Sequence, residues 1–268
     1  MAMTSAIRAV ALDLDGTLAG ADHRVSERSA KVLAALQRRG ILPILVTGRL
    51  ETETLRICAA SQLTAPAVSC NGAVITDPGS RERLFISPMN AEMIGRVLQF
   101  AANYHLQPIL WSATKMFASH PTEATVMLEA INRETFVMTS LDTVDRNEIV
   151  KIILSGERER LDAVQSQLAA SLPQFKRSMD VFYEACNEGV TKWEALSLVL
   201  DRLGIAPGEC MGIADGDTDI GWLSKIGLPV AVENARPAVR AVASLQIGHH
   251  ADDAVAQFLQ DDFKLPAE

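Results

Sequence analysis

Cysteine is scarce in this chain of 268 residues, and its four cysteines are scattered. None forms a C-x-x-C pair or a cluster with histidine, so neither a structural zinc site nor a disulfide framework is expected. Basic residues are also in deficit, with 25 Lys and Arg against 33 Asp and Glu and a net charge of −8. Such an acidic chain lacks the electrostatic footprint of a protein that binds nucleic acid or an anionic membrane.

Long hydrophobic runs are missing too. No stretch approaches the roughly 20 apolar residues that span a bilayer. Residues 1–5 carry no positively charged segment that leads into an apolar one, so we expect no signal peptide and a cytoplasmic location. The 48% hydrophobic and 22% charged residues are ordinary globular values. The length allows one large domain or two smaller ones.

Strand-like and helical patterns alternate in the first seventy residues. Short apolar runs at 7–12, 41–46 and 66–70 predict buried strands, and the segments 26–40 and 50–60 have helical spacing. This alternation predicts a parallel sheet with helices on its faces, and the third run is expected to be its third strand.

The middle of the chain reads differently. Residues 83–189 mix strands, hairpins and helices, among them an expected helix at 157–170, and this order predicts a separate α+β module. The strand and helix alternation returns where a T-x-x-E capping box begins a helix at Thr191. We therefore predict one α/β core built from residues 1–82 and 190–268, with a domain of residues 83–189 inserted.

Two carboxylates follow the first predicted strand. Asp13 and Asp15 point the same way from an extended chain, and like charges so close raise each other's pKa unless a cation or a donor compensates. A solvated turn is the alternative, since Asp-Gly is common in turns. The position favours a ligand site, because open α/β sheets bind ligands at the carboxyl ends of their strands.

A second acidic segment follows the strand predicted at 210–214. Asp215, Asp217 and Asp219 would meet the first pair at one edge of the sheet, where carboxylates need a cation, and their oxygens suit Mg²⁺. An EF-hand loop is the rival interpretation. It fails because Gly216 comes too early and Ile226 stands at the twelfth position.

Two further features indicate an anion site. Thr47, Gly48 and Arg49 end the second strand with a hydroxyl and exposed backbone N–H groups at a helix N-terminus. Lys192 lies in a first helical turn, where the helix dipole disfavours a cation unless it faces an anion. A helix cap and a solvated lysine are the alternatives. Together the four features indicate phosphate chemistry, and the absence of G-x-x-x-x-G-K-[ST] excludes a P-loop.

The four motifs together resemble those of the haloacid dehalogenase (HAD) superfamily. They are D-L-D-G-T-L at 13–18, V-T-G-R at 46–49, the lysine of G-V-T-K at 189–192, and D-G-D-T-D at 215–219. The resemblance runs in order along the whole chain. The insert is placed like the large IIB cap of Cof-type phosphatases, which implies a Rossmann-like parallel sheet core with an inserted α+β cap.

The resemblance implies a role for each matching residue. Asp13 would be the nucleophile that forms an aspartyl-phosphate, and Asp15 the general acid and then the base. Lys192 would serve catalysis and hold the phosphoryl group. The residues expected to bind the phosphoryl group are Thr47, Gly48, Arg49, Asn71, Lys192 and Thr218. The expected Mg²⁺ ligands are Asp13, the backbone carbonyl of Asp15, Asp215 and Asp219.

Two of these expectations carry alternatives. Arg49 can pair with a core carboxylate in place of phosphate. Thr218 stands where the family usually has Asn, and a hydroxyl is shorter and offers one donor where an amide offers two. We expect Thr218 to weaken phosphate binding or to shift substrate choice.

The sequence thus predicts a Mg²⁺-dependent phosphomonoesterase that acts on a small phosphorylated metabolite, with a sugar phosphate as the expected substrate. A phosphotransferase or phosphomutase on the same core is one alternative. A non-catalytic protein that binds a phosphorylated ligand is the other. We expect no nucleic-acid or membrane partner, and a monomer or homodimer.

Overall fold

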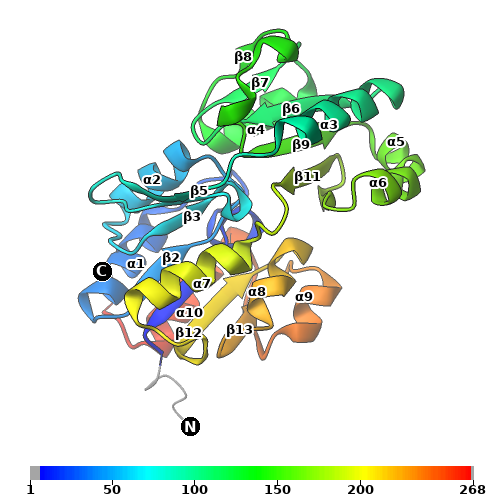
Figure 1. The fold of residues 1–268 in the computed structure, drawn as a ribbon. Coiled ribbons are helices and arrows are strands. Elements are labelled where there is room, and N and C mark those ends of the chain that lie inside the picture. Colours follow the sequence, from blue (N-terminus) through cyan, green and yellow to red (C-terminus); the bar gives the residue numbers. More distant parts are fainter. Residues whose placement is uncertain (1–6, 267–268) are drawn as a thin grey trace.

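A five-stranded parallel sheet forms the lower body of the computed structural model, which describes residues 7–266 (Figure 1). Its order is β14-β13-β12-β1-β2, with every pair parallel. The strands are β1 (Ala9–Leu12), β2 (Leu42–Leu45), β12 (Cys210–Ala214), β13 (Leu228–Ala231) and β14 (Leu245–Gln246). Their runs are apolar because helices cover both faces. The predicted α/β core is confirmed.

The helices of this body begin and end where local signals place them. The side chain of Ser26 accepts a hydrogen bond from the backbone N–H of Ser29 at the start of the first helix, and Gly204 (φ 64°) ends the helix that Thr191 caps. The helices are α1 (Glu27–Arg38), α2 (Glu51–Ala60), α7 (Lys192–Leu203), α8 (Ile220–Leu223), α9 (Pro237–Val242) and α10 (Ala254–Asp262). Short helical turns occur at Leu141–Thr143, Arg146–Glu148, Pro207–Glu209, Asp217–Asp219 and His250–Asp252.

The third predicted strand joins the parallel sheet at a single bridge. β3 (Ala67–Ser69) meets it through one parallel bridge, between Val46 and Val68. Its main partner is β4 (Val74–Thr76), antiparallel, and β4 pairs in turn with β5 (Arg83–Ile86). The third run is therefore a strand that meets the sheet in the expected parallel sense, and residues 70–72, which all take positive φ, then turn the chain back into an antiparallel hairpin with β4.

A second, mixed sheet lies above the core in Figure 1, in the order β10-β11-β9-β6-β7-β8. Its strands are β6 (Gln107–Trp111), β7 (Met116–Ala118), β8 (Val137–Met138), β9 (Lys151–Ser155), β10 (Lys176–Met179) and β11 (Phe182–Cys186). The helices with it are α3 (Ala91–Asn103), α4 (Glu123–Asn132), α5 (Arg158–Ala163) and α6 (Gln165–Ser171). The helix expected at 157–170 is interrupted at Val164, where ψ is −1°. We call this body the cap.

The expected domain division stays a prediction. β5 begins at the first residue of the expected insert, yet it pairs with β4, so its hydrogen bonds favour ending the first core segment after Ile86.

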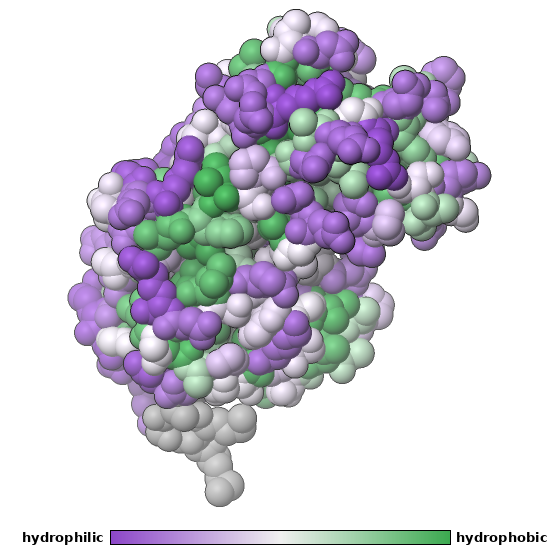
Figure 2. Space-filling view, viewed as in Figure 1, coloured by the Kyte–Doolittle hydropathy of each residue, from purple (hydrophilic) through white to green (hydrophobic). Residues whose placement is uncertain are grey.

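Figure 2 shows apolar side chains gathered over the β3–β5 sheet and α7, where Ile86 and Leu198 are exposed. Among residues 7–266, no helix is long and apolar enough to cross a membrane.

Candidate active site

The loop after β1 is shaped by a glycine. Gly16 has φ +75°, and a Cβ on it would lie 2.4 Å from Asp215 Oδ2, so only glycine fits. Thr17 Oγ1 donates to Asp215 Oδ1 at 3.1 Å. Asn234 Nδ2 donates to the Gly16 carbonyl at 2.7 Å. The loops after β1, β12 and β13 therefore meet at the carboxyl edge of the sheet.

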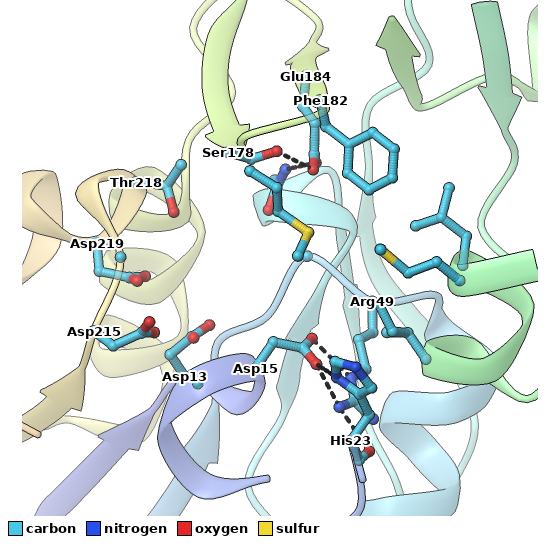
Figure 3. Close-up of a pocket in the computed structure, with 18 of the residues that line it drawn as sticks. Asp13, Asp15, His23, Arg49, Ser178, Phe182, Glu184, Asp215, Thr218 and Asp219 are labelled. Atoms are coloured by element: carbon cyan, nitrogen blue, oxygen red, sulfur yellow. Dashed lines mark hydrogen bonds and ion pairs between the residues drawn. The ribbon is translucent and has the colours of Figure 1, made fainter. Parts of the chain in front are cut away.

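Three carboxylates converge at this edge, as expected from the sequence. One oxygen each of Asp13, Asp215 and Asp219 lies within 4.8 Å of the others (Figure 3). Burial and the charge of Asp219 raise the pKa of Asp13 well above its ordinary range. Burial and the same charge raise the pKa of Asp215 to about 6. The cluster therefore holds more negative charge than its surroundings stabilise.

Lys192 is the cation of this cluster. Its Nζ donates to Asp13 Oδ1 and to Asp219 Oδ1, both at 2.7 Å, and its side chain is buried. Burial alone would lower the pKa of Lys192, but the charges of Asp13 and Asp219 outweigh it and raise that pKa. Asp219 Oδ1 also accepts from Trp222 Nε1 at 2.9 Å. Lys192 therefore stays charged and holds two of the three carboxylates in place.

The donor set fits a hard divalent cation. Three carboxylates against one ammonium leave a net negative charge, and carboxylate oxygens are the ligands that Mg²⁺ prefers. Asp13, Asp215 and Asp219 could each supply one oxygen. The backbone carbonyl of Asp15 as a further ligand stays a prediction.

Asp15 belongs to a different group of side chains. Arg49 donates to it twice, from Nε to Oδ2 at 2.9 Å and from Nη2 to Oδ1 at 2.7 Å. His23 Nδ1 lies 3.3 Å from Oδ1. Burial would raise the pKa of Asp15, but these hydrogen bonds and the charge of Arg49 outweigh it and lower the pKa. Asp15 is a carboxylate here, and Arg49 takes the alternative role of a carboxylate partner.

The residues expected to bind phosphate are only partly brought together. Gly48, Asn71, Thr218 and Lys192 line one cavity, whereas Thr47 is fully buried and its hydroxyl accepts from the Arg49 backbone N–H at 3.1 Å. A Cβ on Gly48 would lie 2.7 Å from Asn71 Oδ1, so a larger residue there would require the Asn71 side chain to move. These phosphate-binding roles stay predictions.

Cap residues that the sequence did not single out complete the cavity. Lys151 Nζ donates to the Gly48 carbonyl at 2.8 Å and to Glu184 Oε2 at 3.1 Å. Glu184 also accepts from Asn71 Nδ2 at 2.9 Å and from Ser178 Oγ at 2.5 Å. The sequence signal that could have identified Lys151 and Glu184 is that each is a lone charged residue in an apolar strand run, I-V-K-I-I-L and F-Y-E-A-C.

The cavity between core and cap has a volume of about 700 Å³, which is typical of a small-molecule site. Its core side carries the carboxylates, Arg49 and Lys192, and its cap side carries Glu184 and several apolar residues. Figure 3 shows Asp15 between the acidic cluster and the pair of Arg49 and His23. The cavity can hold a bound anion next to a metal cation at the carboxylate cluster, with Asp15 facing the chemical group that is attached to the anion.

Comparison with known proteins agrees with this geometry. A sequence model of haloacid dehalogenase-like hydrolases matches residues 10–259. Pyridoxal phosphate phosphatase YbhA of Escherichia coli is 26% identical, over 94% of this chain and 97% of that protein. The 5-amino-6-(5-phospho-D-ribitylamino)uracil phosphatase YitU of Bacillus subtilis is 24% identical, over 96% and 97%. A haloacid dehalogenase-like hydrolase from Bacteroides thetaiotaomicron has the same fold, with a TM-score of 0.85 at 23% identity over 95% and 99% of the two chains.

Proposed function

Because the chain belongs to the haloacid dehalogenase-like hydrolases, as the four motifs indicated, we propose that it hydrolyses a phosphate monoester through an aspartyl-phosphate on Asp13, with Mg²⁺ as the metal. The relatives named above are phosphatases of small phosphorylated metabolites, and this chain is a phosphatase of the same family. The nature of the metal, the covalent intermediate and the leaving group are the proposed part.

The observation that carries the proposal is the pair of contacts of Lys192. A buried lysine that bridges Asp13 and Asp219, beside Asp215, concentrates one ammonium and three carboxylates at the carboxyl ends of parallel strands. Positioned charges of this kind are what phosphoryl transfer requires, since catalysis there is largely positioning and electrostatic stabilisation.

In the first step an Asp13 oxygen attacks phosphorus. A bond forms between that oxygen and phosphorus, and the bond from phosphorus to the leaving-group oxygen breaks. Asp15 gives the departing oxygen its proton. Lys192 holds Asp13 and faces the phosphoryl oxygens. Mg²⁺ held by Asp13, Asp215 and Asp219 would neutralise charge on the phosphoryl group.

In the second step water attacks the phosphorus of the aspartyl-phosphate. Asp15 takes a proton from this water, the bond from Asp13 to phosphorus breaks, and free phosphate leaves. The contacts of Arg49 and His23 suit this step, because they keep Asp15 as the carboxylate that a base must be. In the first step Asp15 acts as an acid, so it must be protonated and must release its contacts with Arg49 and His23.

The substrate side of the proposal is a small phosphorylated metabolite. A sugar phosphate, expected from the sequence, is one form of it, and the leaving group would be chosen by the cap, which faces the cavity. A cytoplasmic location and a monomeric or homodimeric state remain predictions.

The test is phosphate release from a panel of phosphorylated metabolites by the full-length protein, with Mg²⁺ and with a chelator, beside Asp13→Asn. We expect release that needs the metal and is lost in Asp13→Asn. Phosphoryl transfer to an added alcohol without free phosphate would favour the phosphotransferase or mutase. Phosphate-ester binding by a folded protein without turnover would favour a non-catalytic binding protein.

A further inference from the structure

An apolar wall lines the cap side of the active-site cavity. Met127, Leu128 and Ile131 come from one face of α4, Met179 ends β10, and Phe182 begins β11. Leu128, Ile131 and Phe182 are buried, but Met127 and Met179 are each 37% exposed. The two methionines come from separate elements and border the same cavity, so they are the apolar surface that a bound molecule would meet.

The polar side chains of the cap that face the cavity are already engaged. Glu184 accepts hydrogen bonds from Lys151, Asn71 and Ser178. Lys151 Nζ also donates to the Gly48 carbonyl and lies 3.7 Å from the centre of the Trp111 ring. These contacts are internal to the protein and occupy Glu184 and Lys151, while Asp180, an exposed cap carboxylate that also lines the cavity, pairs with Arg158.

Asn132 completes this pattern at the end of α4. Its Oδ1 accepts from the Leu50 backbone N–H at 2.8 Å, and its Nδ2 donates to the Leu128 carbonyl at 3.0 Å. Within residues 7–266, two cavity-lining side chains keep a buried donor without a hydrogen-bond partner, Arg49 at Nη1 and Trp111 at Nε1. Both atoms are buried, and Arg49 Nη1 lies 3.7 Å from Glu53 Oε1, so neither donor is available to a bound molecule.

The balance of these groups decides between classes of leaving group. A sugar carries a hydroxyl on nearly every carbon, and each hydroxyl that leaves water without a new partner costs free energy. A flat ring loses few such bonds and gains by apolar contact, and methionine sulfur makes favourable contacts with aromatic rings. A volume of about 700 Å³ holds a phosphoryl group together with a ring.

We propose that the cap selects a planar aromatic or heteroaromatic leaving group, and that Met127 and Met179 are its specificity-determining residues. The inference rests on the proposed phosphatase activity and narrows its substrate class. It replaces the sugar phosphate with a phosphate ester of an alcohol that carries an aromatic or heteroaromatic ring.

The experiment compares kcat/KM of the full-length protein for phosphate esters of primary alcohols, some of which carry an aromatic ring and some of which are sugars. Benzyl phosphate and pyridoxal 5′-phosphate represent aromatic alcohols, and glucose 6-phosphate and ribose 5-phosphate represent sugars. Acetyl phosphate, which has no ring, reports the basal activity of the wild type. We expect kcat/KM of the wild type to be about tenfold or more higher for the aromatic esters than for the sugar esters, which is the scale on which an apolar pocket discriminates.

The variants assign the preference to the two methionines. The double variant Met127→Ser and Met179→Ser should lower the ratio of kcat/KM for aromatic esters to kcat/KM for sugar esters by about tenfold. The double variant Met127→Leu and Met179→Leu should keep this ratio within about threefold of the wild type. Met138→Ser is the matched control, because Met138 is also a cap methionine and 43% exposed but lies outside the cavity lining. It should leave the ratio unchanged.

Different results overturn different parts. Wild-type preference for sugar esters, or a serine pair that leaves the ratio unchanged, would overturn the aromatic leaving group. Loss of the ratio in Met138→Ser as well would show a structural effect and overturn the assignment to Met127 and Met179. No hydrolysis of acetyl phosphate or of any ester would overturn the phosphatase proposal, and this inference with it.

Discussion

Lys192 Nζ lies 2.7 Å from Asp13 Oδ1 although 179 residues separate the two in the chain. Lys192 is the first residue of α7, and Asp13 is the first residue after β1. The cap sequence lies entirely between them, so this contact closes the core around the insertion. It also fixes the proposed nucleophile, because one of its two carboxylate oxygens is held by a buried cation.

Lys192→Met should lower kcat/KM by about 10²–10³-fold, as the loss of a positioned charge does in other enzymes. The variant leaves Asp13 and Asp219 buried without their ammonium, so the thermal midpoint should fall as well. Steady-state kinetics and thermal unfolding measure the two effects. Lys115→Met, which removes an exposed lysine of the cap, should change neither. Unimpaired turnover in Lys192→Met would remove the central observation of the proposed function.

Asp15→Asn should lower kcat by about 10²–10⁴-fold, the usual contribution of a general acid or base. The loss in kcat/KM should be smaller with p-nitrophenyl phosphate, whose leaving group departs without a proton in the first step. Comparing the kcat/KM losses for this ester and for an alkyl phosphate isolates the first step, because the second step, in which Asp15 is the base, is common to both. Asp217→Asn is the control, since Asp217 is an exposed carboxylate in the same acidic loop. Equal losses for both substrates would contradict a general-acid role.

Gly16→Ala should impair both stability and the acidic cluster. Gly16 and Gly40 share positive φ, +75° and +80°, but a Cβ on Gly40 meets nothing within 4 Å, whereas one on Gly16 meets Asp215 Oδ2 at 2.4 Å. Gly40→Ala should therefore lower the free energy of unfolding by about 1–2 kcal/mol, the cost of the backbone conformation alone.

Gly16→Ala adds the collision to this cost, so Asp215 must move. We expect weaker Mg²⁺ binding by calorimetry and at least about a tenfold lower kcat/KM, with Gly40→Ala close to wild type in both. If the two variants behave alike, the contact between the loop and Asp215 is not needed.

Glu184 should make stability depend on pH. Burial would raise the pKa of Glu184, but the charge of Lys151 and hydrogen bonds from Ser178, Lys151 and Asn71 outweigh it and lower that pKa. A carboxyl with a lowered pKa stabilises the folded state above its unfolded pKa of about 4.3, and the contribution is lost as the pH falls toward the folded value.

The excess stability of the wild type over Glu184→Gln should therefore be complete at pH 7 and shrink below about pH 4.3. Urea unfolding across this range measures it. Glu188→Gln, which changes an exposed carboxylate nearby, should differ little from the wild type at any pH. A difference that grows on acidification would contradict the role given to Lys151 and Glu184.

The sequence predicted the acidic cluster because each member is tied to a local signal. Asp13 and Asp215 directly follow apolar runs, and neighbouring parallel strands bring their carboxyl ends together wherever they pair. Lys192 was marked by its place in a capped first turn. The third run meets the sheet in the expected parallel sense, and its longer antiparallel pairing with β4 follows from the positive φ at 70–72.

The sequence by itself determined the α/β core, the inserted α+β region and the carboxylates at the sheet edge, because strand period, capping and acid placement are local properties. Only the tertiary structure decided the partners of Arg49 and Asn71, the contacts of Lys151 and Glu184, and the place of Met127 and Met179 on the cavity wall. Most of these depend on how the cap meets the core, across contacts such as Asn71 to Glu184 that span 113 residues. A hydrogen bond of this kind leaves no local pattern, since its partners are chosen by packing and desolvation in three dimensions.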